Sequence, residues 1–194
     1  MKIAIITSEF GSNAGGLSFG CLSYAQMLSS LGYEITIIIS NNENWNTNAY
    51  NSKFPIIGNK LVICDGGYKK ELKENLFFRA HIRNVLSEIS ETKYDFFISF
   101  GAGLNGLFAS ELSYILKVKL FVLLRGSEIN LSVSDSKLHT FNYRCLKQAQ
   151  KVIALSEELL ERSKQIYYST NAEYHVIPNS IESCKYISTF TPAK

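Results

Sequence analysis

The sequence has no long apolar run and no large excess of charge of either sign. No stretch approaches the roughly 20 apolar residues that a membrane-spanning helix needs, and Met1 leads into a predicted strand rather than a signal peptide. The 20 basic and 17 acidic residues give a formal charge of +3, too small to indicate nucleic-acid binding. We therefore expect a cytoplasmic protein. The lysines at 69–70, 117 and 119 leave peripheral attachment to the inner face of the membrane as an alternative.

Cysteine, histidine and proline are scarce, with four, three and three residues respectively. The cysteines and histidines lie far apart, at Cys21, Cys64, Cys145, Cys184, His81, His139 and His175. This spacing includes no CxxC pair and argues against both a disulfide framework and a metal site. We expect no metal, cysteines packed in the core and histidines with structural roles.

Apolar runs rich in β-branched residues alternate with helical patterns along the chain. Strands are expected over 2–7, 33–40, 61–64, 94–100, 120–124, 151–155 and 174–178, with a further short strand within the loop 41–59 as an alternative. Helices are expected over 17–31, 69–91, 104–116, 137–149 and 157–167. At 194 residues the alternation predicts one α/β domain, a Rossmann-like doubly wound parallel sheet of about seven strands with helices on both faces. Ligands bind such sheets beyond the carboxyl ends of the strands.

A glycine loop follows the first predicted strand and leads into the first helix. It ends in Gly15 and Gly16, and the apolar face of the helix begins at Leu17. Backbone N–H groups at a helix start can hold an anion when no side chains stand in the way. The loop is therefore a candidate anion site, with a tight turn as the alternative.

The same loop lacks the familiar nucleotide signatures. Gly11 and Gly16 have Walker A spacing, but Leu17 and Ser18 stand where a lysine and a magnesium-binding hydroxyl are required. The second strand ends in Ser40 rather than in an acidic residue, so this loop does not indicate NAD binding either.

A second glycine pattern lies in the middle of the chain. Gly101, Gly103 and Gly106 form a GxGxxG sequence between a predicted strand and a helix, and Glu128 follows the next strand where a ribose-binding carboxylate is expected. This pattern supports an alternative function, binding of a dinucleotide. A simple turn into the helix is the structural alternative.

Charged and polar residues follow the later strands. Arg125 can clamp a phosphate or carboxylate, and Glu128 can hold a sugar hydroxyl or steer Arg125; a mutual ion pair is the structural alternative. Ser156 is a natural N-cap of the helix that follows it. Asp65, beside two glycines, is typical of a turn.

The order of these motifs resembles the N-terminal half of GT-B fold glycosyltransferases, specifically the retaining family 4 group. The segments that carry the resemblance are Lys2 to Phe10 with Gly15-Gly16-Leu17, Arg125 to Ile129, Lys151 to Leu159, and His175 to Glu182. The resemblance implies an N-terminal, acceptor-side domain over 1–182 and a linker over 183–194. A C-terminal domain that binds the nucleotide sugar would follow Thr191-Pro192.

The resemblance also implies a chemistry. A hexosyl-type sugar would move from a nucleotide-sugar donor to a glycan or lipid-linked acceptor with retention of configuration, as in polysaccharide biosynthesis, and this chain alone would be inactive. The catalytic candidates are Arg125 and Glu128. The candidates for binding the diphosphate or acceptor are Gly15, Gly16, Leu17, Ser127, Ser156 and Asn179.

Two departures from the family pattern are visible. Many relatives have histidine where this chain has Arg125, and many read Pro-Asn-Gly where it has Pro178-Asn179-Ser180. Two alternatives remain at this stage. One is a stand-alone dinucleotide-binding domain, an oxidoreductase or a regulator, and the other is a non-catalytic partner subunit of a split glycosyltransferase.

Overall fold

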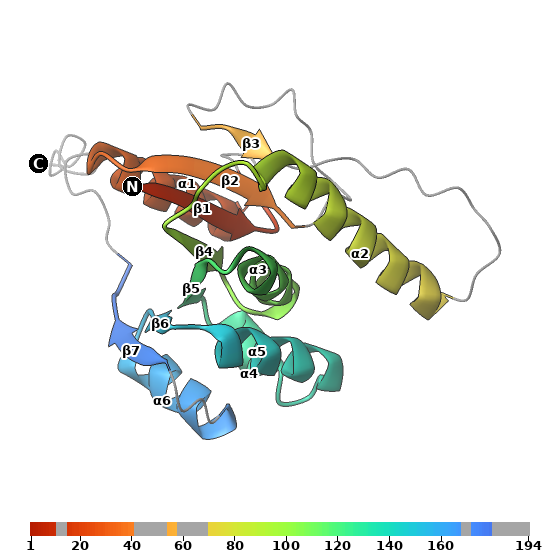
Figure 1. The fold of residues 1–194 in the computed structure, drawn as a ribbon. Helices are drawn as coiled ribbons and strands as arrows, with labels where there is room; N and C mark the ends of the chain where they lie inside the picture. The colour runs from red at the N-terminus through yellow and green to blue at the C-terminus, as the bar shows by residue number, and fades with distance from the viewer. Residues whose placement is uncertain (11–14, 41–53, 58–69, 168–171, 180–194) are drawn as a thin grey trace, which may run out of the picture.

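The computed structural model describes residues 1–10, 15–40, 54–57, 70–167 and 172–179, which form a single parallel sheet and its helices (Figure 1). The strands are β1 Lys2–Thr7, β2 Glu34–Ile39, β3 Ile56–Ile57, β4 Phe96–Phe100, β5 Lys119–Leu124, β6 Lys151–Ala154 and β7 Glu173–Val176. The helices are α1 Gly15–Ser30, α2 Lys70–Ile89, α3 Gly103–Leu116, α4 Ser127–Leu131, α5 Ser136–Gln148 and α6 Glu157–Ile166. The strand order is β3-β2-β1-β4-β5-β6-β7.

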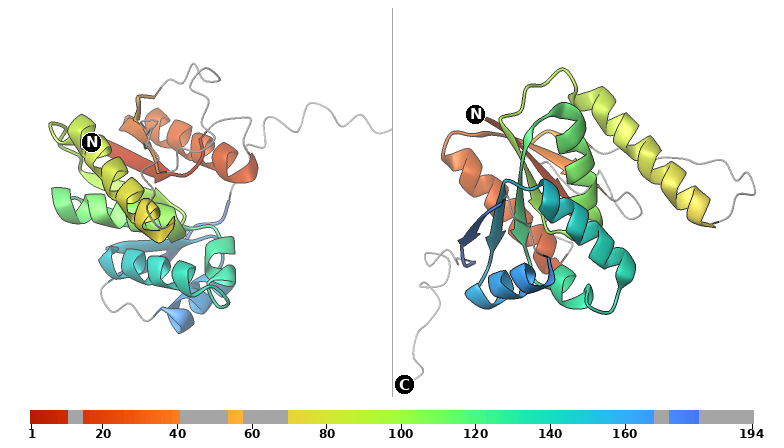
Figure 2. Two further views of the ribbon diagram at one scale, coloured as in Figure 1. Left: turned by 90° about the vertical axis from the view of Figure 1, so that its right-hand side faces the viewer. Right: turned by 60° about the horizontal axis from the view of Figure 1, so that its bottom comes forward.

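The sheet grows in opposite directions from its centre. The chain moves outward from β1 through β2 to β3, and α2 then returns it to β4, which pairs with the other side of β1. From β4 it moves outward again to β7. Because parallel crossovers are right-handed, this reversal places α1 on one face of the sheet and the later helices on the other, as Figure 2 shows.

Two apolar clusters hold these layers together. Ile3 and Ile5 of β1 pack with Cys21 of α1, whereas the alternate residues Ala4 and Ile6 belong to the cluster under α2, α3, α5 and α6. Successive residues of a strand point to opposite faces, so a central strand buried on both sides must be apolar throughout. The predicted doubly wound parallel sheet is confirmed.

Several element boundaries differ from the predictions. Helix α1 begins at Gly15, so the two glycines form its first turn, and the short helix α4 was not predicted. Strand β3 lies within the segment predicted as a loop with a short strand. The predicted strand 61–64, Asp65, Cys64, Cys184 and the predicted linker 183–194 lie outside the described residues.

Some apolar residues of the predicted helices are exposed. Leu31, the last residue of the predicted helix 17–31, is 66% exposed because α1 ends at Ser30 and the chain turns at Gly32, whose φ is +87°. Leu104 and Ile115 of α3 are also exposed, since α5 covers only one side of that helix.

Candidate functional site

The reversal of strand order lies between β1 and β4, and the helices that follow these two strands, α1 and α3, lie on opposite faces of the sheet. In open parallel sheets such a point forms the ligand-binding crevice at the carboxyl edge. Helix α1 starts on one side of it with Gly15 and Gly16, and α3 starts on the other with Gly103. The two glycine patterns that the sequence offered as rivals therefore lie at the carboxyl edge, on either side of the point where the strand order reverses.

Arg125 follows β5 and extends toward α1. Its guanidinium carbon lies 4.6 Å from the centre of the Phe100 ring, at the end of β4, and its Nη1 donates to Asn179 Oδ1 at 3.3 Å. Burial lowers the pKa of the guanidinium below its ordinary value, and the nearby Glu128 carboxylate opposes that shift. An arginine stays charged under these conditions. Its positive charge is therefore fixed at the carboxyl edge.

Gly20 of α1 provides the room for this side chain. A Cβ built at Gly20 would lie 3.1 Å from Arg125 Nη2 and 3.5 Å from Phe100. A glycine inside a helix costs stability, and a close approach of another group is the usual compensation for that cost. The sequence-based prediction missed Gly20, although an isolated glycine in a helical pattern is a signal for such an approach.

Glu128 does not form the ion pair that was considered for it. Its Oε1 accepts the backbone N–H of Arg125 at 2.6 Å, and within the described part of the chain no ion pair joins the two side chains. The carboxylate thus fixes the turn that begins at Gly126, whose φ is +115°, and leaves the guanidinium free to reach Asn179. Ser127 opens α4 and is exposed.

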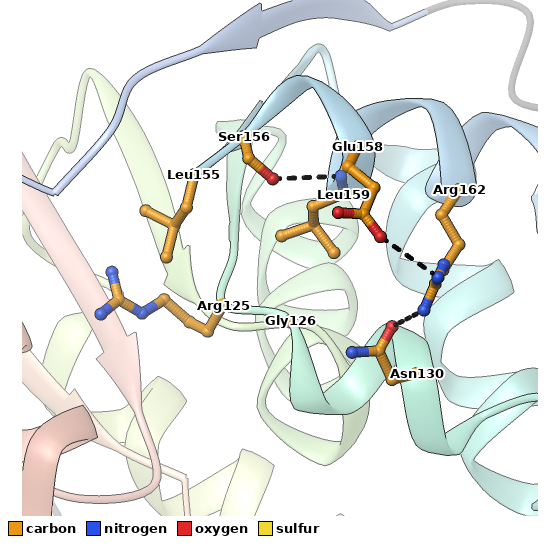
Figure 3. A pocket seen from close by; sticks show the side chains of 8 residues that line it. All are labelled: Arg125, Gly126, Asn130, Leu155, Ser156, Glu158, Leu159 and Arg162. Atoms are coloured by element: carbon orange, nitrogen blue, oxygen red, sulfur yellow. Dashed lines mark hydrogen bonds and ion pairs between the residues drawn. The ribbon is translucent and has the colours of Figure 1, made fainter.

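A cavity of about 230 Å³ lies beside Arg125 at the carboxyl ends of β5 and β6 (Figure 3). It is lined by Arg125, Gly126, Asn130, Leu155, Ser156, Glu158, Leu159 and Arg162. As predicted, Ser156 caps α6, with its hydroxyl accepting the N–H of Leu159 at 3.2 Å. Arg162, on the next turn of α6, was not identified from the sequence.

Asn142 of α5 connects the segments around the site. It is fully buried, and its Oδ1 accepts the N–H of Gly103 at 2.6 Å. Its Nδ2 donates to the Glu128 carbonyl at 2.9 Å and to the Tyr167 hydroxyl at 3.0 Å. The Asn142 amide therefore links the start of α3 to helix α4 and to Tyr167 at the end of α6.

The glycines of the GxGxxG pattern have structural tasks. Gly103 has a φ of +68°, and its N–H, which a phosphate would need, is already bonded to Asn142. A Cβ at Gly106 would lie 2.5 Å from the sulfur of Cys145, so this glycine permits close packing of α3 on α5. These contacts favour a helix-entry turn over a phosphate cradle.

The structure thus brings most of the predicted site residues to one edge. Arg125 and Ser156 line the cavity, Asn179 bonds to Arg125, and Gly16 and half-buried Leu17 lie one turn along α1 from Gly20. A Cβ at Gly16 would meet no atom within 4 Å among the described residues, so a side chain would have room there. Cys21, near Arg125, is no nucleophile at neutral pH because burial raises its pKa to about 12.

The described residues include neither a membrane-spanning helix nor a cluster of metal ligands. None of the described helices is long and apolar enough to cross a membrane. Within the same residues, no group of three or more His, Cys, Asp or Glu side chains could hold a metal ion. His81 is buried in α2, where it bonds to the Ile39 carbonyl at 2.9 Å and packs on Phe108.

Sequence comparison finds no match, either to a protein-family model or to a curated protein. Several solved structures, by contrast, match this chain in fold. Two of sucrose-phosphate synthase from Thermosynechococcus elongatus have TM-scores of 0.62 and 0.63 at 13% and 14% identity, and they cover 94% and 91% of this chain. MurG from Acinetobacter baumannii has a TM-score of 0.53 at 11% identity and covers 99% of this chain.

The fraction of each matched structure that this chain covers differs from one structure to the next. This chain covers 91% of the first sucrose-phosphate synthase chain, but only 47% of the second and 50% of MurG. It thus spans about half the length of those two longer chains. At such identities the likeness concerns the fold alone. The chain is an α/β domain with the Rossmann-like fold of one lobe of the GT-B glycosyltransferases that it matches.

Proposed function

We propose that this chain is the acceptor-side lobe of a retaining, family 4 type glycosyltransferase. A second lobe would bind a nucleotide sugar, and the two would enclose the carboxyl edge of this sheet. The observation that carries the proposal is the position of Arg125, which lies against α1, Phe100 and Asn179 beside an open cavity. The GT-B fold and the coverage of about half of two longer neighbours support it.

The chemistry fits these residues. In retaining transfer the departing diphosphate can take the proton of the acceptor hydroxyl, so this lobe needs no strong base. It needs positive charge and backbone donors near the diphosphate. Arg125 supplies the charge, and the N–H groups in the first turn of α1, which begins at Gly15, supply donors. Glu128 is a positioning residue, because it holds the backbone of Arg125.

The test is sugar transfer by a protein that carries both lobes. We expect transfer from one of a panel of UDP- and GDP-hexoses to a glycan or glycolipid fraction, with retention of the anomeric configuration measured by NMR of the product. The isolated 194-residue chain should give no transfer under the same conditions. Transfer by the isolated chain would contradict the two-lobe proposal, and an inverted product would contradict retention.

The split-enzyme alternative places the donor lobe on a separate polypeptide. It predicts that this chain becomes active on mixing with that polypeptide. The dinucleotide alternative is not proposed further, because the Gly103 N–H and the space at Gly106 are already used within the domain.

A further inference from the structure

The GxGxxG segment carries one polar side chain that the domain uses only in part. The backbone N–H of Gly103 and the space at Gly106 are taken, but Asn105, which lies between them, is bonded through only one end of its amide. Asn105 belongs to the first turn of α3 and is only 8% exposed. Its Oδ1 accepts the hydroxyl of Ser40, directly after β2, at 2.5 Å. Within the described part of the chain, its Nδ2 has no hydrogen-bond partner.

The hydrogen bonds of Ser40 decide which end of the Asn105 amide is free. The backbone N–H of Ser40 donates to the Thr7 carbonyl at 2.8 Å, whereas the Ser40 hydroxyl lies 3.2 Å from that carbonyl. Because the N–H already satisfies the Thr7 carbonyl, the hydroxyl proton goes to the closer Asn105 Oδ1. Both Nδ2 hydrogens therefore point away from Ser40, and the amide is a donor held in a fixed orientation.

The Nδ2 group borders a small space above Gly101, the residue that follows β4. Gly101 has a φ of +102°, and a Cβ built on it would lie 4.0 Å from Asn105 Nδ2 and 3.9 Å from Arg125 Cγ. Among the described residues, the fully enclosed side-chain nitrogen and oxygen atoms without a partner are His81 Nδ1 and Ser163 Oγ, so solvent reaches Asn105 Nδ2. A ligand can therefore approach the amide beside the stem of Arg125.

Asn105 and Arg125 offer different interactions beside this space. Arg125 brings a positive charge and extends toward α1, whereas Asn105 brings neutral donor hydrogens from α3, on the other face of the sheet. Preorganised donors of both kinds stabilise negative charge on a bound group. A diphosphate carries oxygens on two phosphorus atoms, so one phosphate can meet the guanidinium while the other meets the amide. A single phosphate has no second group to offer.

We propose that Asn105 binds the diphosphate of the donor, with its Nδ2 donating to one phosphate while Arg125 attracts the other. This inference rests on the proposed function, because it adds a residue to the same diphosphate site. It assigns the GxGxxG segment a contact through a side chain, although the backbone at Gly103 is already bonded within the domain.

The direct test is binding of two simple anions to the 194-residue chain, measured by calorimetry. Inorganic pyrophosphate should bind about tenfold more tightly than inorganic phosphate or better, because only pyrophosphate reaches both donors. In NMR spectra of the same chain, the side-chain amide signals of Asn105 should move more with pyrophosphate than with phosphate. Equal affinity for the two anions, or Asn105 amide signals that do not move, would overturn the proposal.

Variants at position 105 separate a binding role from a structural one. Asn105→Asp keeps the size and the acceptor for the Ser40 hydroxyl but replaces the donor with a carboxylate oxygen, and it should weaken pyrophosphate about tenfold or more. Asn105→Leu should bind pyrophosphate no better than phosphate. Thermal unfolding of the same samples shows whether each variant is folded.

Asn84→Asp is the matched control. It adds the same charge in the second half of α2, which leads to the amino end of β4, and it should leave the affinity for pyrophosphate unchanged. Unchanged affinity in folded Asn105→Asp, or equal losses in Asn105→Asp and Asn84→Asp, would overturn the proposal.

The outcomes also separate this inference from the proposed function. If the two-lobed protein transfers sugar but Asn105→Asp leaves both pyrophosphate binding and the KM for the nucleotide sugar unchanged, the assignment of Asn105 is wrong and the transferase proposal stands. If pyrophosphate binds through Asn105 as expected but no nucleotide sugar supports transfer, the assignment of Asn105 stands and the transferase proposal fails.

Discussion

Replacing Arg125 with methionine is expected to lower sugar transfer by the two-lobed protein about a hundredfold or more, with little change in stability. Methionine keeps the apolar stem against Phe100 but removes the fixed positive charge. Loss of one preorganised donor to a developing negative charge typically costs roughly 10²–10³ in turnover. The measurement is kcat with saturating donor, together with thermal unfolding of the same samples. Arg144→Met, on the α3–α5 surface, is the control and should match the wild type.

A change at Gly20 tests the position of Arg125 without touching its charge. Gly20→Ala adds a methyl group 3.1 Å from Nη2, so the guanidinium must shift. Alanine also favours the helix over glycine by about 0.5–1 kcal/mol. We therefore expect lower turnover in a protein that is as stable as the wild type or more so. Full activity in Gly20→Ala, or unchanged turnover in Arg125→Met, would remove Arg125 from the proposed mechanism.

The second large effect is expected on stability, at Asn142. Leucine has a similar size and cannot bond to Gly103, Glu128 or Tyr167, so Asn142→Leu leaves three buried polar groups unsatisfied. Each such group costs about 1–3 kcal/mol, and we expect the free energy of unfolding to fall by about 3 kcal/mol or more. For a domain of this size that lowers Tm by roughly 6–12 °C.

Two further variants serve as references for the loss of stability expected in Asn142→Leu. Tyr167→Phe removes one of the three partners and should cost roughly a third as much. Asn130→Leu loses a single exposed contact with Arg162 and should change stability by less than about 0.5 kcal/mol. If Asn142→Leu unfolds at the same denaturant concentration as Asn130→Leu, the network around Asn142 does not stabilise the domain.

Local patterns were enough to predict the sheet. Ile3 to Ile6 form an apolar run that only a strand buried on both faces explains, and Ser156 marked the start of α6 correctly. The register of the strands, by contrast, depends on contacts between distant segments. The sequence therefore did not reveal that β4 pairs with β1, nor that the two glycine patterns lie on either side of the point where the strand order reverses.

The direction of side chains at the site was harder to predict. An ion pair between Arg125 and Glu128 was one alternative because the two residues are close in sequence, but Glu128 bonds to a backbone N–H and Arg125 turns toward Gly20. Asn142 did leave a signal: it stands four residues after Leu138 and three before Cys145, on the apolar stripe of α5. A polar residue at such a position indicates a buried hydrogen-bond network.

The central claim is that ligands of this domain bind at the carboxyl edge between α1 and Arg125, and the most direct test is a map of amide NMR shifts. On titration of the chain with inorganic pyrophosphate, which represents the diphosphate of the donor, we predict that the largest shifts occur at Gly16, Gly20, Arg125 and Gly126. NAD at the same concentration should produce no stronger response at Gly103 and Gly106. Shifts centred on Gly103 and Gly106 with tighter binding of NAD, or shifts at the amino edge of the sheet, would contradict the account.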